Sequence, residues 1–195
     1  MLNICEKRVI MELKKFSNDK ADDMTLAPVD DSDVTKLIGS FVGFENTPYD
    51  GGRYEISFDI PSNFPFKPPK AKFITRVWHP NVSSASGYIC LDLLREDKWA
   101  PGLSLKNVLT SIKTLLILAQ PDDPQDAAVA SQFIDNHELF EKTAMYWNHV
   151  FAGGPEKPEF VEMTEKVNLL VSNGWDKTEA VHQLSIANWN IDMIN

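Results

Sequence analysis

The sequence predicts an α+β protein with an N-terminal helix, a four-stranded antiparallel meander sheet, C-terminal helices and a small three-helix bundle. Residues 53–60 alternate apolar and polar side chains, as a half-buried strand does. Residues beyond 100 carry helix-capping side chains in place of that alternation. Because the strands precede these helices and do not alternate with them, the order argues against a repeated β-α-β arrangement.

The first predicted element is a helix over residues 2–16. Its apolar side chains recur at helical spacing and form one stripe: Cys5, Val9, Leu13 and Phe16. Its cations lie off that stripe: Lys7, Arg8, Lys14 and Lys15. A solvated face is the simpler interpretation of these charges, and a docking patch for an acidic partner is the alternative.

The predicted sheet occupies residues 24–77. Segments 34–42 and 70–77 flank the strand at 53–60, and the turn residues DGG precede it at 50–52. Residues 61–69 contain four prolines, which exclude a helix or a central strand there. We expect this stiff loop to bury one of its two phenylalanines, Phe64 and Phe66.

The helices after residue 100 are predicted from their ends. Ser104 can cap a helix that runs to about Ala119. Asp123 before Pro124 suits a cap followed by a first-turn proline. A helix from Asn136 through Val150 ends at the glycine pair 153–154.

A change of pattern near residue 153 predicts a domain boundary. We expect a core at 1–152, a linker at 153–158 and a three-helix bundle at 159–195. The apolar stripe of its first helix is Phe160, Met163, Val167 and Leu170. The tetrapeptide DKTE at 176–179 reads as a capping box for its second helix, and residues 190–195 form a very short third one.

Composition bounds the possible functions. A net charge of -9 and a pI near 4.9 argue against a general nucleic-acid binder. No stretch approaches the roughly 18 apolar residues that span a bilayer, so we expect no membrane partner. Two cysteines and no recognisable secretory leader favour the cytosol or nucleus. Cysteine and histidine spacing predicts no metal site.

Cys90 is ambiguous from its neighbours alone. A cysteine between Ile89 and Leu91 is usually a buried small hydrophobe. The irregular, Gly-containing run before it suits instead a functional loop that displays a nucleophile. None of the four histidines lies in the local signature of a cysteine hydrolase. Both interpretations stay open at this point.

Six motifs together resemble the ubiquitin-conjugating enzymes, in family order over residues 4–151. WHPN at 78–81 and GYICLDLL at 87–94 resemble the active-site signature. The others are RVIMEL at 8–13, YDGGRY at 49–54, FPFKPP at 64–69, WAPGL at 99–103 and QPDDP at 120–124. Residues 158–195 are similar to a ubiquitin-associated domain. The nine-residue step from Asn81 to Cys90 resembles the 25-kDa subtype that bears this domain and builds chains.

The resemblance implies a thioester mechanism. Cys90 would accept the C-terminal glycine of ubiquitin from an activating enzyme and pass it to a lysine, so no histidine base is required. Asn81 would stabilise the oxyanion, or else only hold its loop. Asp123 would orient or deprotonate the lysine, or else cap a helix. His79 and Pro80 would fix the turn, and Asp92 would form a structural ion pair.

The resemblance also implies docking residues. Those for the activating enzyme are Lys7, Arg8, Lys14 and Lys15, and those for a ligase are Phe66 and Pro101. In the tail, the usual Met-Gly-Phe loop reads Asn173-Gly174-Trp175. The last helix is also short. We therefore expect the tail to keep its fold and to bind ubiquitin through Gly174 and Trp175 with reduced or altered affinity.

The leading hypothesis is therefore an enzyme that conjugates ubiquitin and builds polyubiquitin chains for proteasomal degradation. Its partners would be ubiquitin, the activating enzyme, ligases and protein substrates. It would act as a monomer without a cofactor, because the separate activating enzyme uses the ATP. The alternatives are a non-catalytic ubiquitin-binding adaptor, a cysteine hydrolase and a conjugating enzyme for another ubiquitin-like protein.

Overall fold

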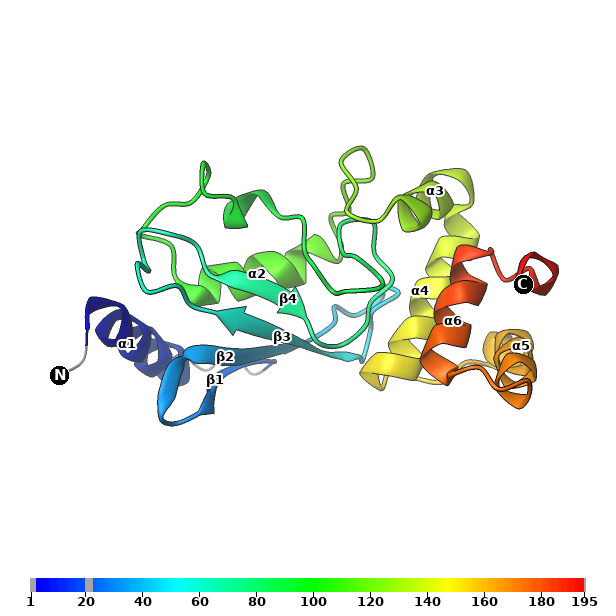
Figure 1. Cartoon of the computed structure of the whole chain (residues 1–195), viewed down its shortest axis with the longest axis horizontal. Coiled ribbons are helices and arrows are strands. Elements are labelled where there is room, and N and C mark those ends of the chain that lie inside the picture. Colours follow the sequence, from blue (N-terminus) through cyan, green and yellow to red (C-terminus); the bar gives the residue numbers. More distant parts are fainter. Residues whose placement is uncertain (1–2, 20–22, 195) are drawn as a thin grey trace.

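The computed structural model describes residues 3–19 and 23–194 of the chain. It confirms the α+β class: one helix, four strands and then a series of helices (Figure 1). The strands are β1 (Met24–Asp30), β2 (Asp33–Val42), β3 (Arg53–Asp59) and β4 (Lys70–Phe73). The helices are α1 (Ile4–Asn18), α2 (Leu105–Leu115), α3 (Ala127–Asp135), α4 (His137–Ala152), α5 (Val161–Ser172) and α6 (Lys177–Ile186).

The sheet is an antiparallel meander in the order β1-β2-β3-β4. Ile56 of β3 pairs with Gly39 of β2 and with Phe73 of β4, so β3 is a central strand of the sheet. The apolar residues of β3 are buried, as the alternation predicts: Tyr54, Ile56 and Phe58.

Helix α2 packs against this buried face. Leu105, Leu109 and Ile112 of α2 are fully buried. A Cβ at Gly39 would lie 2.9 Å from the Phe58 ring and 3.1 Å from a Leu109 methyl carbon. Glycine at this position therefore permits the close approach of helix and sheet.

Helix α1 begins at a capping box, in which Asn3 and Glu6 satisfy each other's backbone N–H groups. The predicted stripe is buried at Cys5, Val9 and Phe16. In the proline loop, Phe64 is buried and Phe66 is 72% exposed, so the loop buries one phenylalanine, as expected.

The structure corrects three predicted boundaries. The fourth strand ends at Phe73 and not at residue 77, and α2 ends at Leu115 and not near Ala119. Asp123 caps no helix, because the N-cap of α3 is Asp126. The backbone N–H groups of Gln125 and Asp126 both donate to Pro80 O, and Asp126 keeps an extended backbone. These bonds delay the start of the helix.

The tail folds as two helices with a 3₁₀ turn at each end, η2 (Pro158–Phe160) and η3 (Ile191–Met193). Its predicted stripe is buried: Phe160, Met163, Val167 and Leu170. Helix α6 lies beside α4, at the end of the molecule opposite α1 (Figure 1).

The predicted capping box of the tail is only half correct. Asp176 does cap α6, because its carboxylate accepts from the N–H groups of Thr178 and Glu179. The Glu179 carboxylate bonds instead with the Gln183 amide one turn later. A reciprocal box therefore does not form at this helix.

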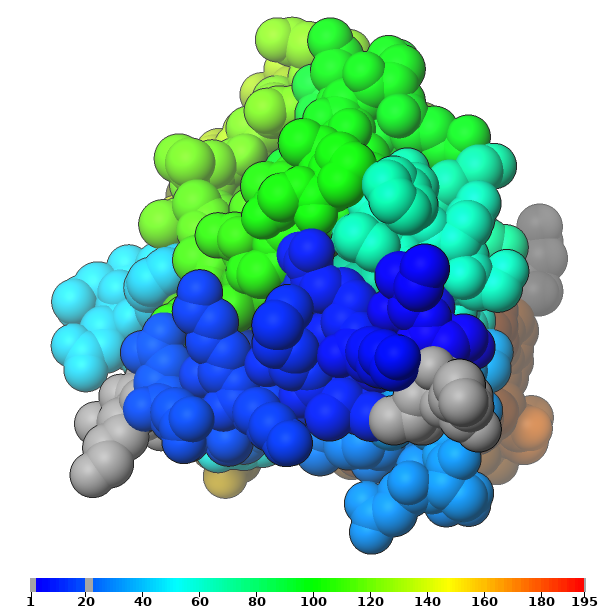
Figure 2. Space-filling model, turned by 90° about the vertical axis from the view of Figure 1, so that its left-hand side faces the viewer, coloured from blue at the N-terminus to red at the C-terminus, as the bar shows by residue number. Residues whose placement is uncertain are grey.

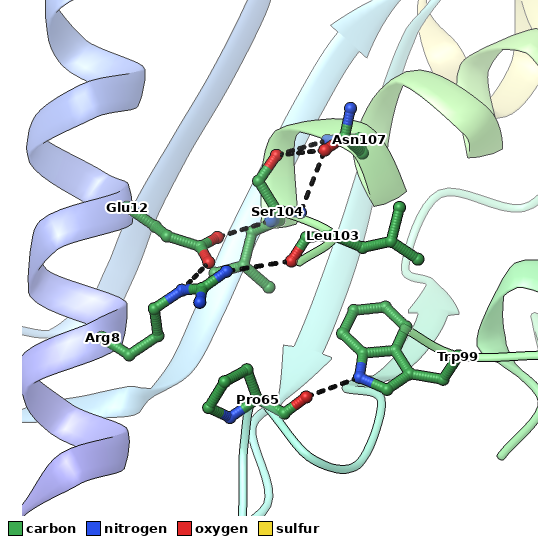
Figure 3. A network of polar contacts seen from close by, with 8 residues as sticks. Arg8, Glu12, Pro65, Trp99, Leu103, Ser104 and Asn107 are labelled. Atoms are coloured by element: carbon green, nitrogen blue, oxygen red, sulfur yellow. Dashed lines mark hydrogen bonds and ion pairs between the residues drawn. The ribbon is translucent and has the colours of Figure 1, made fainter. Parts of the chain in front are cut away.

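A buried carboxylate joins α1 to the start of α2. Glu12 Oε2 accepts from Leu105 N at 2.6 Å, and Glu12 Oε1 pairs with Arg8 Nε at 2.5 Å (Figure 3). The Arg8 guanidinium also donates to Leu103 O at 3.2 Å. A negative charge at the N-terminus of α2 is favourable, and it satisfies a backbone donor that the helix leaves unpaired.

Glu12→Ala removes this carboxylate and leaves the buried N–H of Leu105 without its partner. We expect the free energy of unfolding to fall by about 1.5–3 kcal/mol, the usual value of a hydrogen bond to a charged group. Urea denaturation followed by tryptophan fluorescence measures it. The control is Glu165→Ala, at an exposed position of α5, which should change stability by less than about 0.5 kcal/mol. Equal stability of the two variants would contradict the assigned role of Glu12.

Candidate active site

Cys90 lies in an irregular segment that a few backbone contacts fix in place. Its N–H donates to Asn81 O at 2.9 Å, and the adjacent Ile89 bridges Val82. Gly87 turns the chain with φ +78, and a Cβ there would lie 2.2 Å from Phe73 O. The segment therefore presses against the sheet edge and leaves the Cys90 thiol partly exposed as a free cysteine.

The surroundings of Cys90 favour the thiol over the thiolate. Burial raises its pKa above the usual value, the negative charges of Asp123 and Asp92 raise it further, and Arg95 opposes them. Within the described residues, no histidine is among the groups that shift this pKa. Among the described residues, the site therefore lacks the imidazole base that activates the thiol of a cysteine hydrolase.

Asn81 is buried and holds a neighbouring segment through its side-chain amide. Its Nδ2 donates to Gln120 O at 2.9 Å and to Asp123 O at 3.0 Å. Its Oδ1 accepts from Gln120 N at 2.8 Å. Because an amide nitrogen has two hydrogens, both donors are used here. The loop-holding role is present in the structure, and the oxyanion role stays a prediction.

His79 and Pro80 form the turn that carries Asn81. His79 Nδ1 accepts from Asn81 N at 3.0 Å, and burial lowers the pKa of His79 to about 3. The imidazole is therefore neutral across the physiological range and bonds within its own turn. Pro80 O accepts the two backbone bonds that fix the start of α3.

The two acidic residues near the thiol differ in their contacts. Asp92 lies 3.6 Å from Arg95, which is the ion pair expected for it. Asp123 is exposed on the segment that Asn81 holds, and its charge acts on Cys90. With the capping alternative removed, the remaining hypothesis for the Asp123 carboxylate is that it acts on an incoming lysine.

The predicted docking residues on α1 differ in whether their side chains are exposed or already bonded within the protein. Lys7, Lys14 and Lys15 are exposed on α1, whereas Arg8 is bonded to Glu12 and Leu103 O. Figure 2 shows the face that carries α1, beside segments coloured as residues of the proline loop and of the chain after residue 100.

Phe66 and Pro101 are both exposed on two loops that contact each other. Trp99 Nε1 donates to Pro65 O at 2.7 Å and so joins the loops (Figure 3). The structure therefore places the two predicted ligase-docking residues on adjoining loops.

The tail loop differs in exposure from residue to residue. Asn173 and Gly174 are exposed, and Gly174 adopts φ +95. Trp175 is partly buried, and its backbone N–H donates to Leu170 O at 3.1 Å. Part of the indole therefore stays accessible.

The part of the chain that the structure describes contains neither a candidate metal site nor a candidate membrane-spanning helix. In residues 3–19 and 23–194, no group of three or more His, Cys, Asp or Glu side chains could hold a metal ion. No helix within the same ranges is long and apolar enough to cross a membrane.

Sequence reasoning missed Ser84 and Asp126 as parts of the site. Asp126 Oδ2 accepts from Ser84 Oγ at 2.6 Å and from Ser84 N at 3.0 Å. Its position one residue before an apolar, alanine-rich helix was an available signal for Asp126 as a cap. Ser84 had no signal in the local sequence, because its partner lies 42 residues away.

A protein-family model described as "Ubiquitin-conjugating enzyme" matches residues 8–148. The chain belongs to the ubiquitin-conjugating enzyme family. Members of this family transfer ubiquitin, so the chain is a transferase by family. The family and the activity that the sequence motifs suggest are thereby confirmed.

Relatives match the core and, in several cases, the tail. Human ubiquitin-conjugating enzyme E2 K is 43% identical over 98% of this chain and 96% of its own length. Ubiquitin-conjugating enzyme E2 21 of Caenorhabditis elegans is also 43% identical, over 98% of this chain and 90% of its own. A solved structure of a putative ubiquitin conjugating enzyme from Plasmodium yoelii is 42% identical with a TM-score of 0.74, and it covers 80% of this chain and 99% of its own.

Asp123→Asn removes a negative charge that acts on Cys90, so we expect it to lower the pKa of the thiol. The Cys90 alkylation rate by iodoacetamide, measured against pH by mass spectrometry, should show a lower midpoint than in the unchanged protein. Glu45→Gln is the control, because Glu45 is exposed and is not among the groups that shift this pKa. An unchanged or higher midpoint in Asp123→Asn would contradict the assigned electrostatics.

Proposed function

We propose that this ubiquitin-conjugating enzyme carries ubiquitin as a thioester on Cys90. The observation that supports the proposal is a partly exposed thiol on a fixed loop. Among the described residues, carboxylates and a guanidinium shift its pKa and no histidine does. Such a thiol suits acyl exchange, in which the attacking sulfur replaces another thiolate and no strong base is needed. It does not suit a hydrolase.

The transfer step then uses the residues around Cys90. The lysine nitrogen attacks the thioester carbonyl, the nitrogen–carbon bond forms, the carbon–sulfur bond breaks, and the Cys90 thiolate leaves. Asp123 would orient the lysine ammonium or accept its proton. Asn81 would stabilise the oxyanion by exchanging one of its two backbone acceptors for it.

The docking surfaces follow from exposure. Lys7, Lys14 and Lys15 would meet an acidic surface of the activating enzyme, because they are free to approach it on α1. Arg8 would contribute mainly by fixing α1 to Leu103. Phe66 and Pro101 would contact a ligase as an apolar pair on adjoining loops.

The biological setting is also part of the proposal. The product would be a polyubiquitin chain that directs its substrate to the proteasome, made in the cytosol or nucleus. The enzyme would work as a monomer and need no cofactor, because ATP is consumed by the activating enzyme that supplies the thioester.

The test uses the two cysteines of the chain. We expect an adduct about one ubiquitin heavier when the protein is incubated with activating enzyme, ATP and ubiquitin, and we expect reductant to remove it. Cys90→Ala should abolish the adduct and Cys90→Ser should give a reductant-resistant ester. Cys5→Ser is the matched control and should keep the adduct, because Cys5 is buried under the proline loop. An unchanged adduct in Cys90→Ala would refute the assignment. Ubiquitin binding without any adduct would favour the adaptor hypothesis.

We also propose that the tail contacts ubiquitin through the 173–175 loop, with Gly174 and Trp175 at its centre. Titration of ¹⁵N-labelled ubiquitin with the full chain should shift ubiquitin resonances, and Trp175→Ala should weaken the shifts. Lys177→Ala, an exposed neighbour, is the control and should retain them. Equal shifts with Trp175→Ala and Lys177→Ala would exclude this loop as the contact.

A further inference from the structure

The tail is joined to the core by buried polar contacts as well as by apolar packing. Trp147 Nε1 of α4 donates to Ser185 Oγ of α6 at 2.8 Å. Trp189 Nε1 donates to Thr143 Oγ1 of α4 at 2.9 Å. The Trp189 ring also packs edge-on against Tyr146, with centroids 5.1 Å apart. A free bundle would leave these indole and hydroxyl groups to water.

The turn after α6 has a backbone that requires strong support. Asn188 has φ +51 and Trp189 has φ +60, which is the left-handed region. A bulky residue such as tryptophan rarely adopts it, and such strain persists where surrounding contacts fix the residue. Trp189 N donates to Leu184 O at 2.7 Å, and Lys166 Nζ donates to Trp189 O at 2.9 Å. These two bonds fix the turn within the tail, and the bond from the Trp189 indole to Thr143 fixes it against α4.

One chain of hydrogen bonds, here called a route, runs from this turn to Trp78, the residue before His79. Gln132 of α3 is 3% exposed, and its Oε1 accepts from Trp78 Nε1 at 2.7 Å. Its Nε2 donates to Asn188 Oδ1 at 2.8 Å. One buried amide thus bonds at one end to the segment that carries Asn81 and at the other end to the tail.

A second route begins at His182 of α6. Ser84 Oγ gives its only hydrogen to Asp126 Oδ2, at 2.6 Å. The contact of 3.0 Å between Ser84 Oγ and His182 Nε2 therefore requires the imidazole to donate. The neutral ring can do so through Nε2–H, and burial lowers the pKa of His182. The order of donation is His182, Ser84, Asp126.

Both routes end on the same short segment. Trp78 and Ser84 lie on either side of Asn81, whose amide holds residues 120–123 and whose carbonyl accepts from Cys90 N. We propose that Gln132 and His182 are positioning residues, through which the tail holds segment 78–84 in the arrangement that transfer from Cys90 requires. The inference rests on the proposed thioester chemistry of Cys90.

The experiment separates loading of Cys90 from transfer. The full-length protein is charged with ubiquitin, charging is stopped, and loss of the thioester to free lysine is followed in single turnovers over a range of lysine concentrations. We expect His182→Leu and Gln132→Leu to slow the maximal transfer rate by about 3- to 10-fold while the charging rate stays within about twofold. His182→Gln supplies an amide N–H in place of Nε2–H and should restore transfer.

A matched control lies next to His182 on the same helix. Gln183 bonds only within the tail in the described part of the chain, to Glu179, so Gln183→Leu should transfer at the unchanged rate. The double variant His182→Leu with Ser84→Ala should transfer no more slowly than the slower of the two single variants, because both substitutions interrupt the same route. Thermal unfolding of each variant identifies any loss of the fold.

The outcomes divide clearly. Slow transfer in His182→Leu, with rescue by His182→Gln and normal charging, supports the proposal. Unchanged transfer in folded His182→Leu and Gln132→Leu overturns it, and so does equal slowing of His182→Leu and His182→Gln. If Gln132→Leu fails to fold, the partly exposed position 182 still decides the matter. Failure of the unchanged protein to form any thioester would refute the proposed function itself.

Discussion

The buried amide of Asn81 is the interaction on which the site depends. It joins two segments about 40 residues apart through three hydrogen bonds to backbone atoms of Gln120 and Asp123. Neither segment has regular secondary structure that could fix it alone. Because a buried amide without partners costs about 1–3 kcal/mol, the two segments are stable together and not separately. The thiol of Cys90 and the carboxylate of Asp123 are placed near each other as a result.

The same principle extends to the tail. Its helices are small, and their apolar face alone would give marginal stability. The core supplies the packing surface that the small bundle lacks. Trp147 and Gln132 of the core bond to the tail, and Trp189 of the tail bonds to the core. A tail docked in this way leaves Asn173 and Gly174 exposed and Trp175 partly accessible, so the proposed support of the active-site segment and the proposed contact with ubiquitin would use different surfaces of the tail.

The sequence predicted the fold correctly where the interactions that determine an element lie within a few residues of one another. The alternation around Ile56 and the left-handed glycine after α4 are signals within a few residues, and both are present in the structure. The motif resemblance likewise supplied the family. Local pattern failed at Asp123, because the backbone of Gln125 and Asp126 bonds to Pro80 on a distant segment and moves the helix start. The sequence pattern also did not show that the Arg8 guanidinium bonds to Glu12 and to Leu103 O.

The contacts of Gln132 and His182 lay beyond any sequence argument. Their side-chain hydrogen-bond partners are 53 to 98 residues away, and neither side chain belongs to a motif. Only the packing of α3, α4 and α6 brings them together. Polar residues with long-range partners are therefore where a structure adds most to a family assignment.

Hydrogen exchange at the Gln120 amide tests the central claim most directly, because its N–H donates to Asn81 Oδ1 at 2.8 Å. Asn81→Ala should increase exchange at Gln120 by about tenfold or more, since a lost hydrogen bond of about 1.4 kcal/mol corresponds to that factor. Amides in the centre of β3 should exchange at unchanged rates. Equal Gln120 exchange in the unchanged protein and in Asn81→Ala would contradict the account.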